Sequence, residues 1–309
     1  MKILLCVLFL LPAWAQIGAD TPPADQDKPP ANAEGQSADR SVIMPKPGGE
    51  TIKPKDYHDA TGYWHPFGRM GRYFVQDQKG IWTSPFHTSK RDAKFWVIFG
   101  AATGGLIAAD KYVSHNAPKT PWLQTLGDDT SYLGEPYVLL PIAASFYFGG
   151  TAYGSDHFRE AGLLSFEALA STTVMMVALK SVFDRQRPTE GHGNGEFGAS
   201  TGARYNASFP SGHSLETFCM ASVFAHEYPH KLWVKILAYS YAGGVVGARL
   251  AANRHFPGDV MAGGAIGWFI GDYTYGKRHN PDLDKKPTIT QRIISHVRIG
   301  GPAPVVPGY

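Results

Sequence analysis

The chain has 309 residues, with little cysteine, little net charge and no long apolar run. Two cysteines, Cys6 and Cys219, are too few for a fold built on disulfides. The 29 basic and 26 acidic residues leave a net charge of +3, too small and too dispersed to indicate a nucleic-acid partner. No uninterrupted run reaches the roughly 18 apolar residues of a clear membrane span. The chain is 43% hydrophobic, enough for one large domain or two small ones.

The N-terminus has the pattern of a secretory signal peptide over residues 1–15. Lys2 precedes an apolar run at residues 3–11, and Ala13 and Ala15 form a small-x-small cleavage pattern. The run is well short of the roughly 20 residues that a spanning helix needs. We therefore expect the mature protein to be exported.

Composition divides the rest of the chain into four parts. Residues 16–56 are rich in Pro, Ala, Asp and Gly, and we expect a disordered linker because they cannot bury enough apolar surface. Residues 57–93 carry aromatic side chains without a clean period and are predicted to form a packed collar. Residues 94–275 form the main domain, and the tail at 276–309 begins with a loop and continues as a short strand or an extended arm.

The main domain is predicted to be an all-α single bundle of about six helices. Its apolar segments are longer than strands and show no sustained alternation. The candidate helices are residues 95–109, 137–153, 161–183, 214–228, 232–250 and 257–275. Charged residues interrupt or bound several of them, so hydropathy alone leaves a transmembrane arrangement open. These residues are Glu135, Glu167, Glu216, Lys235 and Asp272.

The first of three polar motifs contains Lys180, Arg187 and Pro188. Residues seven apart project from one face of a helix, two turns apart, where both cations can contact one polyanion. Pro188 tends to end that helix. Alone, the motif equally describes a basic helix end that complements its own dipole. Asp184 and Arg185 are predicted to point elsewhere, as ion partners at the surface or behind the site.

The second motif is Pro210-Ser211-Gly212-His213-Ser214, at the entry to a predicted helix. Ser211 and Gly212 allow the backbone to approach an anion at the positive end of the helix, and His213 can donate a proton. An ordinary helix cap at Ser211 is the alternative.

The third motif places His255 just ahead of a helix that begins at Pro257. Asp259, four residues after the histidine, can reach back to one imidazole nitrogen, fix the tautomer and leave the other nitrogen nucleophilic. A His-Asp pair is also a common structural hydrogen bond.

Together the three motifs resemble the superfamily of type 2 phosphatidic acid phosphatases, bacterial class A acid phosphatases and vanadium haloperoxidases. Its pattern is K-x6-RP, then PSGH, then SR-x5-H-x3-D. The matching residues are Lys180, Arg187, Pro188, Pro210 to His213, Arg249, His255 and Asp259. The resemblance covers residues 94–275, and Ala248 stands where the family usually has Ser. That departure affects one expected hydrogen bond to phosphate.

The resemblance implies a phosphatase that works without a metal ion or cofactor. His255 would attack phosphorus to form a phosphohistidine, Asp259 would orient it, and His213 would protonate the leaving alcohol and then activate water. The phosphate-binding groups would be Lys180, Arg187, Arg249, the Ser211 hydroxyl and the Gly212 N–H. Lipid phosphates, isoprenoid pyrophosphates and small phosphomonoesters would all suit this anion site.

Two other functions stay open. Haloperoxidases of the superfamily use the same residues to hold vanadate, and a non-catalytic phosphate- or lipid-binding protein is the third possibility. The glycine-rich stretch 191–195 lacks a preceding strand and does not predict a nucleotide site. Several histidines lack metal-ligand spacing and are interpreted as surface or packing residues. They are His58, His65, His87, His157 and His192.

The expected signal peptide also constrains topology. From an exported N-terminus, three spanning helices would place Lys180 and Arg187 in the cytoplasm, whereas six-span enzymes of this family typically face their site outward. We therefore expect a soluble or peripheral bundle in the periplasm or cell envelope, with possible contact to a membrane surface. An integral membrane protein is the alternative.

Overall fold

The computed structural model describes residues 65–87, 90–117, 120–281 and 283–284. These residues form helices and connecting turns without any strand, so the predicted all-α bundle is confirmed. The expected signal peptide, the linker, His58 and the end of the tail lie outside the described residues.

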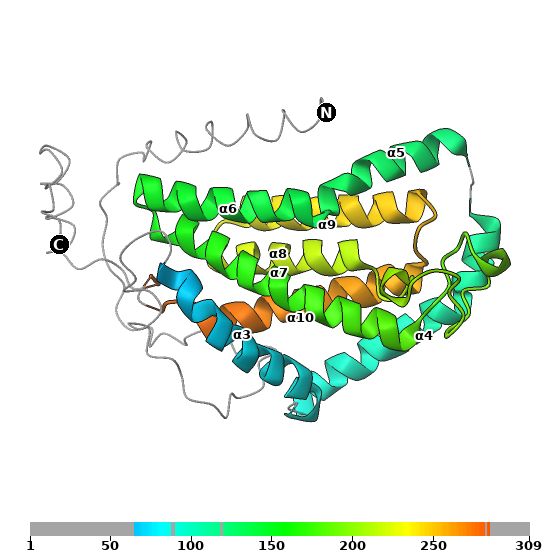
Figure 1. Ribbon diagram of the computed structural model, residues 1–309, viewed down its shortest axis with the longest axis horizontal. Helices are drawn as coiled ribbons and strands as arrows, with labels where there is room; N and C mark the ends of the chain where they lie inside the picture. Colours follow the sequence, from blue (N-terminus) through cyan, green and yellow to red (C-terminus); the bar gives the residue numbers. More distant parts are fainter. Residues whose placement is uncertain (1–64, 88–89, 118–119, 282, 285–309) are drawn as a thin grey trace, which may run out of the picture. The chain divides into compact units, whose positions relative to one another are not determined.

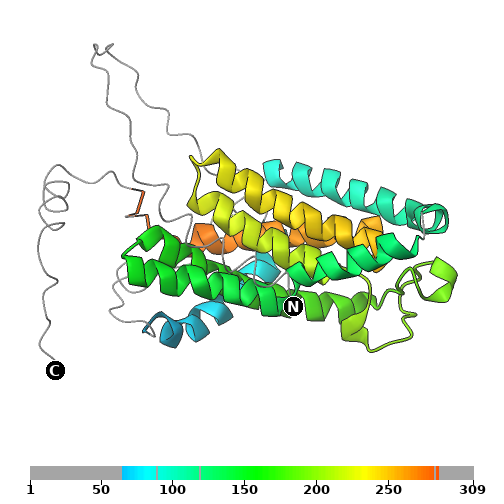
Figure 2. The same cartoon turned by 90° about the horizontal axis from the view of Figure 1, so that it is seen from above.

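Long helices coincide with all of the predicted segments. They are α4 (Lys90–Asn116), α6 (Pro136–Tyr153), α7 (Asp156–Phe183), α8 (Gly212–Glu227), α9 (Leu232–Ala251) and α10 (Pro257–Arg278). Helix α8 is almost wholly buried and packs against α7, α9 and α10 (Figure 1, Figure 2). It is therefore the core helix on which the others are arranged.

Helix α10 approaches α8 closely because glycine recurs along the contact. A Cβ atom on Gly267 would lie 1.9 Å from the Leu215 carbonyl oxygen, and one on Gly271 would lie 2.4 Å from that of Cys219. Side chains at these positions would separate the two helices, so glycine allows the first half of α8 to pack closely against the middle of α10.

Two further helices lie outside the predicted set. Helix α3 (His65–Thr83) lies in the predicted collar and contacts α7 and α10, with Tyr73 and Ile81 in the apolar core. Helix α5 (Pro121–Ser131) packs against α9, where a Cβ on Gly127 would meet backbone atoms.

The helices run alternately between two ends of the bundle. Helices α4, α7 and α9 finish, and α6, α8 and α10 begin, at the end that lies to the right in Figure 1. We call this the site end, because all three polar motifs lie there, and the opposite end the far end. The order of the helices thus brings motifs up to 80 residues apart to one place.

Length and hydropathy identify one helix among the described residues, α7, that could cross a membrane. Its most apolar window is 56% buried inside the bundle, as the core helix of a soluble protein also can be. This finding alone is weak evidence for a span.

Candidate active site

The structure brings all the predicted site residues to the site end. Lys180 lies in the last turn of α7, Ser211 to His213 at the start of α8, Arg249 in the last turn of α9, and Asp259 in the first turn of α10. Arg187 and His255 lie in the connections between these helices. The Ser211 N–H donates to the Asp259 carbonyl oxygen at 3.0 Å and so joins the second motif to the third.

His255 is buried, with 3% of its surface exposed. Its Nδ1 lies 2.8 Å from the Ser208 carbonyl oxygen, which can only accept. The proton therefore sits on Nδ1, and Nε2 carries the lone pair. Burial lowers the pKa of His255 well below its ordinary value, and the charges of Arg187 and Lys180 lower it further despite the opposing effect of Asp259. The imidazole is thus neutral and nucleophilic.

Asp259 lies beside the imidazole, as the sequence predicts, but at ion-pair distance rather than hydrogen-bond distance. Its Oδ2 is 3.8 Å from His255 Nδ1 and instead accepts from the Ser208 hydroxyl at 2.6 Å and the Phe256 N–H at 3.0 Å. The carboxylate caps the start of its own helix, which turns it away from the ring. The Ser208 carbonyl orients His255 directly, and Asp259 acts through Ser208.

Arg185 lies behind this pair and is only 1% exposed. Its Nη1 contacts Asp259 Oδ1 at 2.6 Å and Asp110 Oδ2 at 3.0 Å, and its Nε donates to the Gly195 carbonyl at 3.1 Å. Phe256 stacks on the guanidinium at 4.4 Å. Arg185 is therefore a buried partner of the predicted aspartate, and the glycine-rich stretch supplies one of its acceptors.

Three cations of the site are held by uncharged oxygen atoms. Lys180 Nζ donates to the Ala207 carbonyl, Arg187 to the Arg254 carbonyl and to both oxygens of Asn206, and Arg249 Nη1 to the Ser131 hydroxyl. Within the described part of the chain, Lys180, Arg187 and Arg249 form no ion pair with a carboxylate. Their positive charge is left for a bound anion.

The start of α8 allows an anion to approach its backbone closely, and Ser211 does not cap the helix with its side chain. Ser211 is fully buried and occupies the N-cap position, but its side chain makes no capping bond, so the simple cap interpretation is wrong. Its hydroxyl accepts from Ser214 Oγ at 3.1 Å and keeps its own proton to donate. A Cβ on Gly212 would lie 2.4 Å from Met176 Sδ. The backbone here can face an anion directly.

His213 projects from the first turn of α8 toward α6. Its Nε2 lies 3.1 Å from Oε1 of Glu135, the residue that precedes α6. The carboxylate is one-third exposed. Glu135 is thus the group best placed to assist proton transfer by His213.

Ala248, at the position where the resemblance expects Ser, is buried against α5. A nearby hydroxyl is that of Ser131, which accepts from Arg249. Sequence reasoning missed Ser131, Ser208 and Asp110 because each joins the site across a long separation in the chain and belongs to no motif. Arg185 was visible in the sequence beside Lys180 and Arg187, but the sequence does not show that its side chain points toward Asp259 and Asp110.

Comparison with known protein families supports the resemblance that the three motifs indicate. The model of the PAP2 superfamily matches residues 161–280, which contain every predicted site residue, so the resemblance is confirmed.

Two curated relatives are named as phosphatases, in agreement with the expected enzyme class. The lipid A 1-phosphatase of Porphyromonas gingivalis is 29% identical over 140 residues, which cover 44% of this chain and 28% of that protein. The phosphatidylglycerophosphatase B of Bacillus subtilis is 29% identical over 188 residues, which cover 57% of this chain and 87% of that protein. The chain thus spans little more than a quarter of the first relative.

Two solved structures are also similar. One is the transmembrane PAP2-type phosphatidylglycerolphosphate phosphatase from Bacillus subtilis, with 23% identity, a TM-score of 0.44, and coverage of 73% of this chain and 99% of that one. The other is LpxE of Aquifex aeolicus, with 28% identity, a TM-score of 0.41, and coverage of 54% and 92%.

Proposed function

We propose that this protein is a lipid phosphatase that hydrolyses a phosphomonoester or pyrophosphate through a phosphohistidine on His255, without a metal ion in the reaction. The observation that carries the proposal is the trio of Lys180, Arg187 and Arg249. These cations have no carboxylate partner in the described chain. Lys180 and Arg187 act electrostatically on the neutral imidazole of His255, whose Nδ1 faces the Ser208 carbonyl and whose Nε2 carries the lone pair. Such a site offers a nucleophile and the charge that phosphoryl transfer requires.

The reaction follows from the placement of these groups. His255 Nε2 attacks phosphorus while the bond to the leaving oxygen breaks, and His213 protonates that oxygen. His213 then takes a proton from water, the water oxygen attacks phosphorus, and the P–N bond breaks to release phosphate. The three cations, the Ser211 hydroxyl and the Gly212 N–H neutralise the other phosphate oxygens throughout.

A lipid substrate is supported by the outer faces of the bundle. Large apolar side chains are exposed on α9 and α4, including Ile236 at 58%, Leu237 at 48%, Val97 at 70% and Ile98 at 70%. Large apolar faces of this kind suit contact with lipid chains. We propose that the bundle is embedded in a membrane. Both curated relatives are named as phosphatases of lipids, which also supports a lipid substrate. The soluble or peripheral location expected from the sequence is the competing prediction.

The test replaces the nucleophile and its control in the purified full chain. His255→Ala should abolish both phosphate release and phosphoenzyme formation, while His192→Ala, at an exposed histidine, should leave both unchanged. Phosphatidic acid, an isoprenoid pyrophosphate and an aryl phosphate are the substrates to compare. Near-normal turnover by folded His255→Ala protein contradicts the mechanism. Halide oxidation with vanadate and peroxide, in place of phosphate release, identifies a haloperoxidase.

A further inference from the structure

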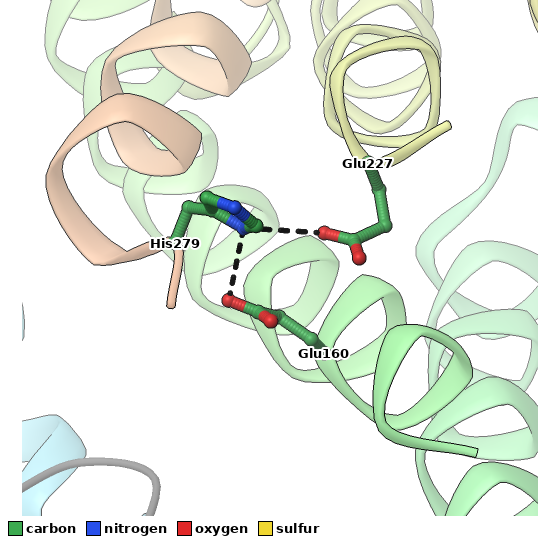
Figure 3. A group of neighbouring side chains, drawn as sticks. All are labelled: Glu160, Glu227 and His279. Carbon is green, nitrogen blue, oxygen red and sulfur yellow. Dashed lines mark ion pairs between the residues drawn. The ribbon is translucent and has the colours of Figure 1, made fainter. Parts of the chain in front are cut away.

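A second group of chemically reactive side chains lies at the far end of the bundle. Glu160 on α7, Glu227 in the last turn of α8 and His279 at the end of α10 point toward one another (Figure 3). One atom from each lies within 4.8 Å of the others. The two glutamates are 3% and 2% exposed, so this cluster is buried.

The two distances from the imidazole to the glutamates are close to those between ligand atoms in a coordination shell. His279 Nδ1 lies 3.3 Å from Glu160 Oε1 and 3.6 Å from Glu227 Oε2. Both His279 Nδ1 and Glu227 Oε2 are buried without a hydrogen-bond partner. A tetrahedral zinc ion with bonds near 2.05 Å keeps its ligand atoms about 3.4 Å apart.

Each of the three side chains is also oriented from outside the cluster. His279 Nε2 lies 3.2 Å from Asp284 Oδ2, which places the ring proton on Nε2 and turns Nδ1 toward the glutamates. Glu227 Oε1 contacts His157 Nδ1, and Glu160 Oε1 accepts from the Asn280 N–H at 2.6 Å. Metal-binding histidines and carboxylates are typically fixed by such outer partners.

We propose that Glu160, Glu227 and His279 bind one divalent transition-metal ion, with zinc as the best match. One imidazole nitrogen and two carboxylate oxygens suit Zn²⁺, whereas Ca²⁺ and Mg²⁺ prefer oxygen ligands alone. Three protein ligands leave a position for water. His157 acts as the outer partner of Glu227.

The cluster favours positive charge. Burial opposes a charged imidazole, yet attraction from Glu160 and Glu227 raises the pKa of His279 to about 10. A proton on Nδ1 is therefore the competitor of the metal, and the experiment must distinguish the two occupants.

The site is remote from the reaction. Glu160 and Lys180 are 20 residues apart on the continuous helix α7, a separation of about 30 Å along its axis. A metal at the far end would join the start of α7 to the ends of α8 and α10. The inference concerns the stability of the bundle and is independent of the proposed phosphatase activity.

Metal content is the direct measurement. The purified full chain is stripped with a chelator, dialysed against Zn²⁺ and measured by elemental analysis and thermal unfolding. We expect one zinc per chain and a rise in Tm of roughly 5 °C when free Zn²⁺ is 100 times the Kd. Glu227→Gln removes a charged ligand with little change of shape and should lose both effects.

The matched control is Asp272→Asn. Asp272 forms a contact of 3.1 Å with His226 between α10 and α8, two of the helices that carry the cluster. This variant should keep the zinc and the Tm response. Equal zinc binding by wild type and Glu227→Gln, or no zinc bound by folded wild type, overturns the proposal in favour of a protonated His279.

Discussion

At the scale of single residues, Ser208 joins the two groups that define the nucleophile. Its carbonyl oxygen accepts from His255, and its hydroxyl donates to Asp259. The backbone carbonyl alone is sufficient to fix the tautomer, because it cannot donate. The carboxylate then holds Ser208 and Arg185 in place, and in the proposed mechanism it supplies negative charge near the ring when phosphorus is attacked.

The role of His213 as the acid predicts a dependence on the leaving group. His213→Ala should slow hydrolysis of an alkyl phosphate by about 10²- to 10⁴-fold and that of an activated aryl phosphate much less. The reason is that an aryl oxide leaves as a stable anion without a proton. Rates for both substrates with wild type and variant provide the measurement, and equal losses remove His213 from the acid role.

The lowered pKa of His255 predicts the acid side of the pH profile. The ordinary pKa of a histidine is 6.5. Because the pKa of His255 is lower, its imidazole stays neutral at pH values at which an ordinary histidine gains a proton. We therefore expect kcat/KM for an aryl phosphate to begin to fall only at a pH below 6.5. Lys180→Met removes one of the nearby charges that lower this pKa and should move the fall to higher pH.

The control for this shift is Lys111→Met, at an exposed lysine of α4. It should leave the profile unchanged. A fall at or above pH 6.5 in the wild type would show that His255 is not the neutral nucleophile.

The residues of the site were predictable where chemistry is concentrated in a short motif. Lys180, His213 and His255 were found in this way because each motif places them at a helix end. Ser208 was not found, since its function depends on a backbone carbonyl that any residue could supply. Asp259 was found beside His255, but its longer distance from the ring was not, because helix capping, Ser208 and Arg185 compete for the same oxygen atoms.

At the scale of elements, apolar length predicted the six long helices to within a few residues at most ends. Helix α3 was missed because its glycines weaken the helical pattern. The structure explains the glycine at position 80, because a larger residue would collide with α10. A Cβ there would lie 1.8 Å from the Tyr273 hydroxyl of α10. Helix α5 has only 11 residues and a polar end, so it lacks the apolar periodicity that reveals a helix.

Helix α4 is fastened to the site by Asp110, and this predicts a loss of stability. Asp110 accepts from the Gly258 N–H at 3.1 Å and pairs with Arg185. Asp110→Asn keeps the first bond but turns an amide group toward the guanidinium, which should lower the free energy of unfolding by about 2 kcal/mol. Thermal unfolding measures the change. Asp129→Asn, at an exposed aspartate, should have little effect, and equal behaviour of the two variants would contradict the buried pair.

At the scale of the whole molecule, the bundle separates two kinds of chemistry. The anion site and its cations lie at one end, and the Glu-His cluster lies at the other. Helices α4, α6 and α7 run alternately between these ends, and the first motif begins in the last turn of α7. If the expected signal peptide exports the segment before α4, a membrane-spanning bundle would hold its active site in the cytoplasm.

If the bundle is embedded in a membrane, a charged residue introduced on its outer face should destabilise it. Ile236→Glu, on the exposed face of α9, should cost about 3 kcal/mol on transfer into a bilayer and reduce the folded protein in the membrane fraction. In water the same change would be harmless. Tyr205→Glu is the control, since Tyr205 is 67% exposed in the connection between α7 and α8. Detergent should be required for extraction. Release by high salt, with normal folding of Ile236→Glu, would support the soluble or peripheral location.

The partners of the three cations also bear on what happens after hydrolysis. Carbonyl, amide and hydroxyl oxygens of the chain hold Lys180, Arg187 and Arg249, and these oxygens stay in place when an anion arrives or leaves. In the proposed reaction, the attraction that draws in the substrate is therefore undiminished when inorganic phosphate is ready to depart. Escape of the product competes with arrival of the next substrate, and the phosphate concentration around the protein sets the share of molecules that are free to work.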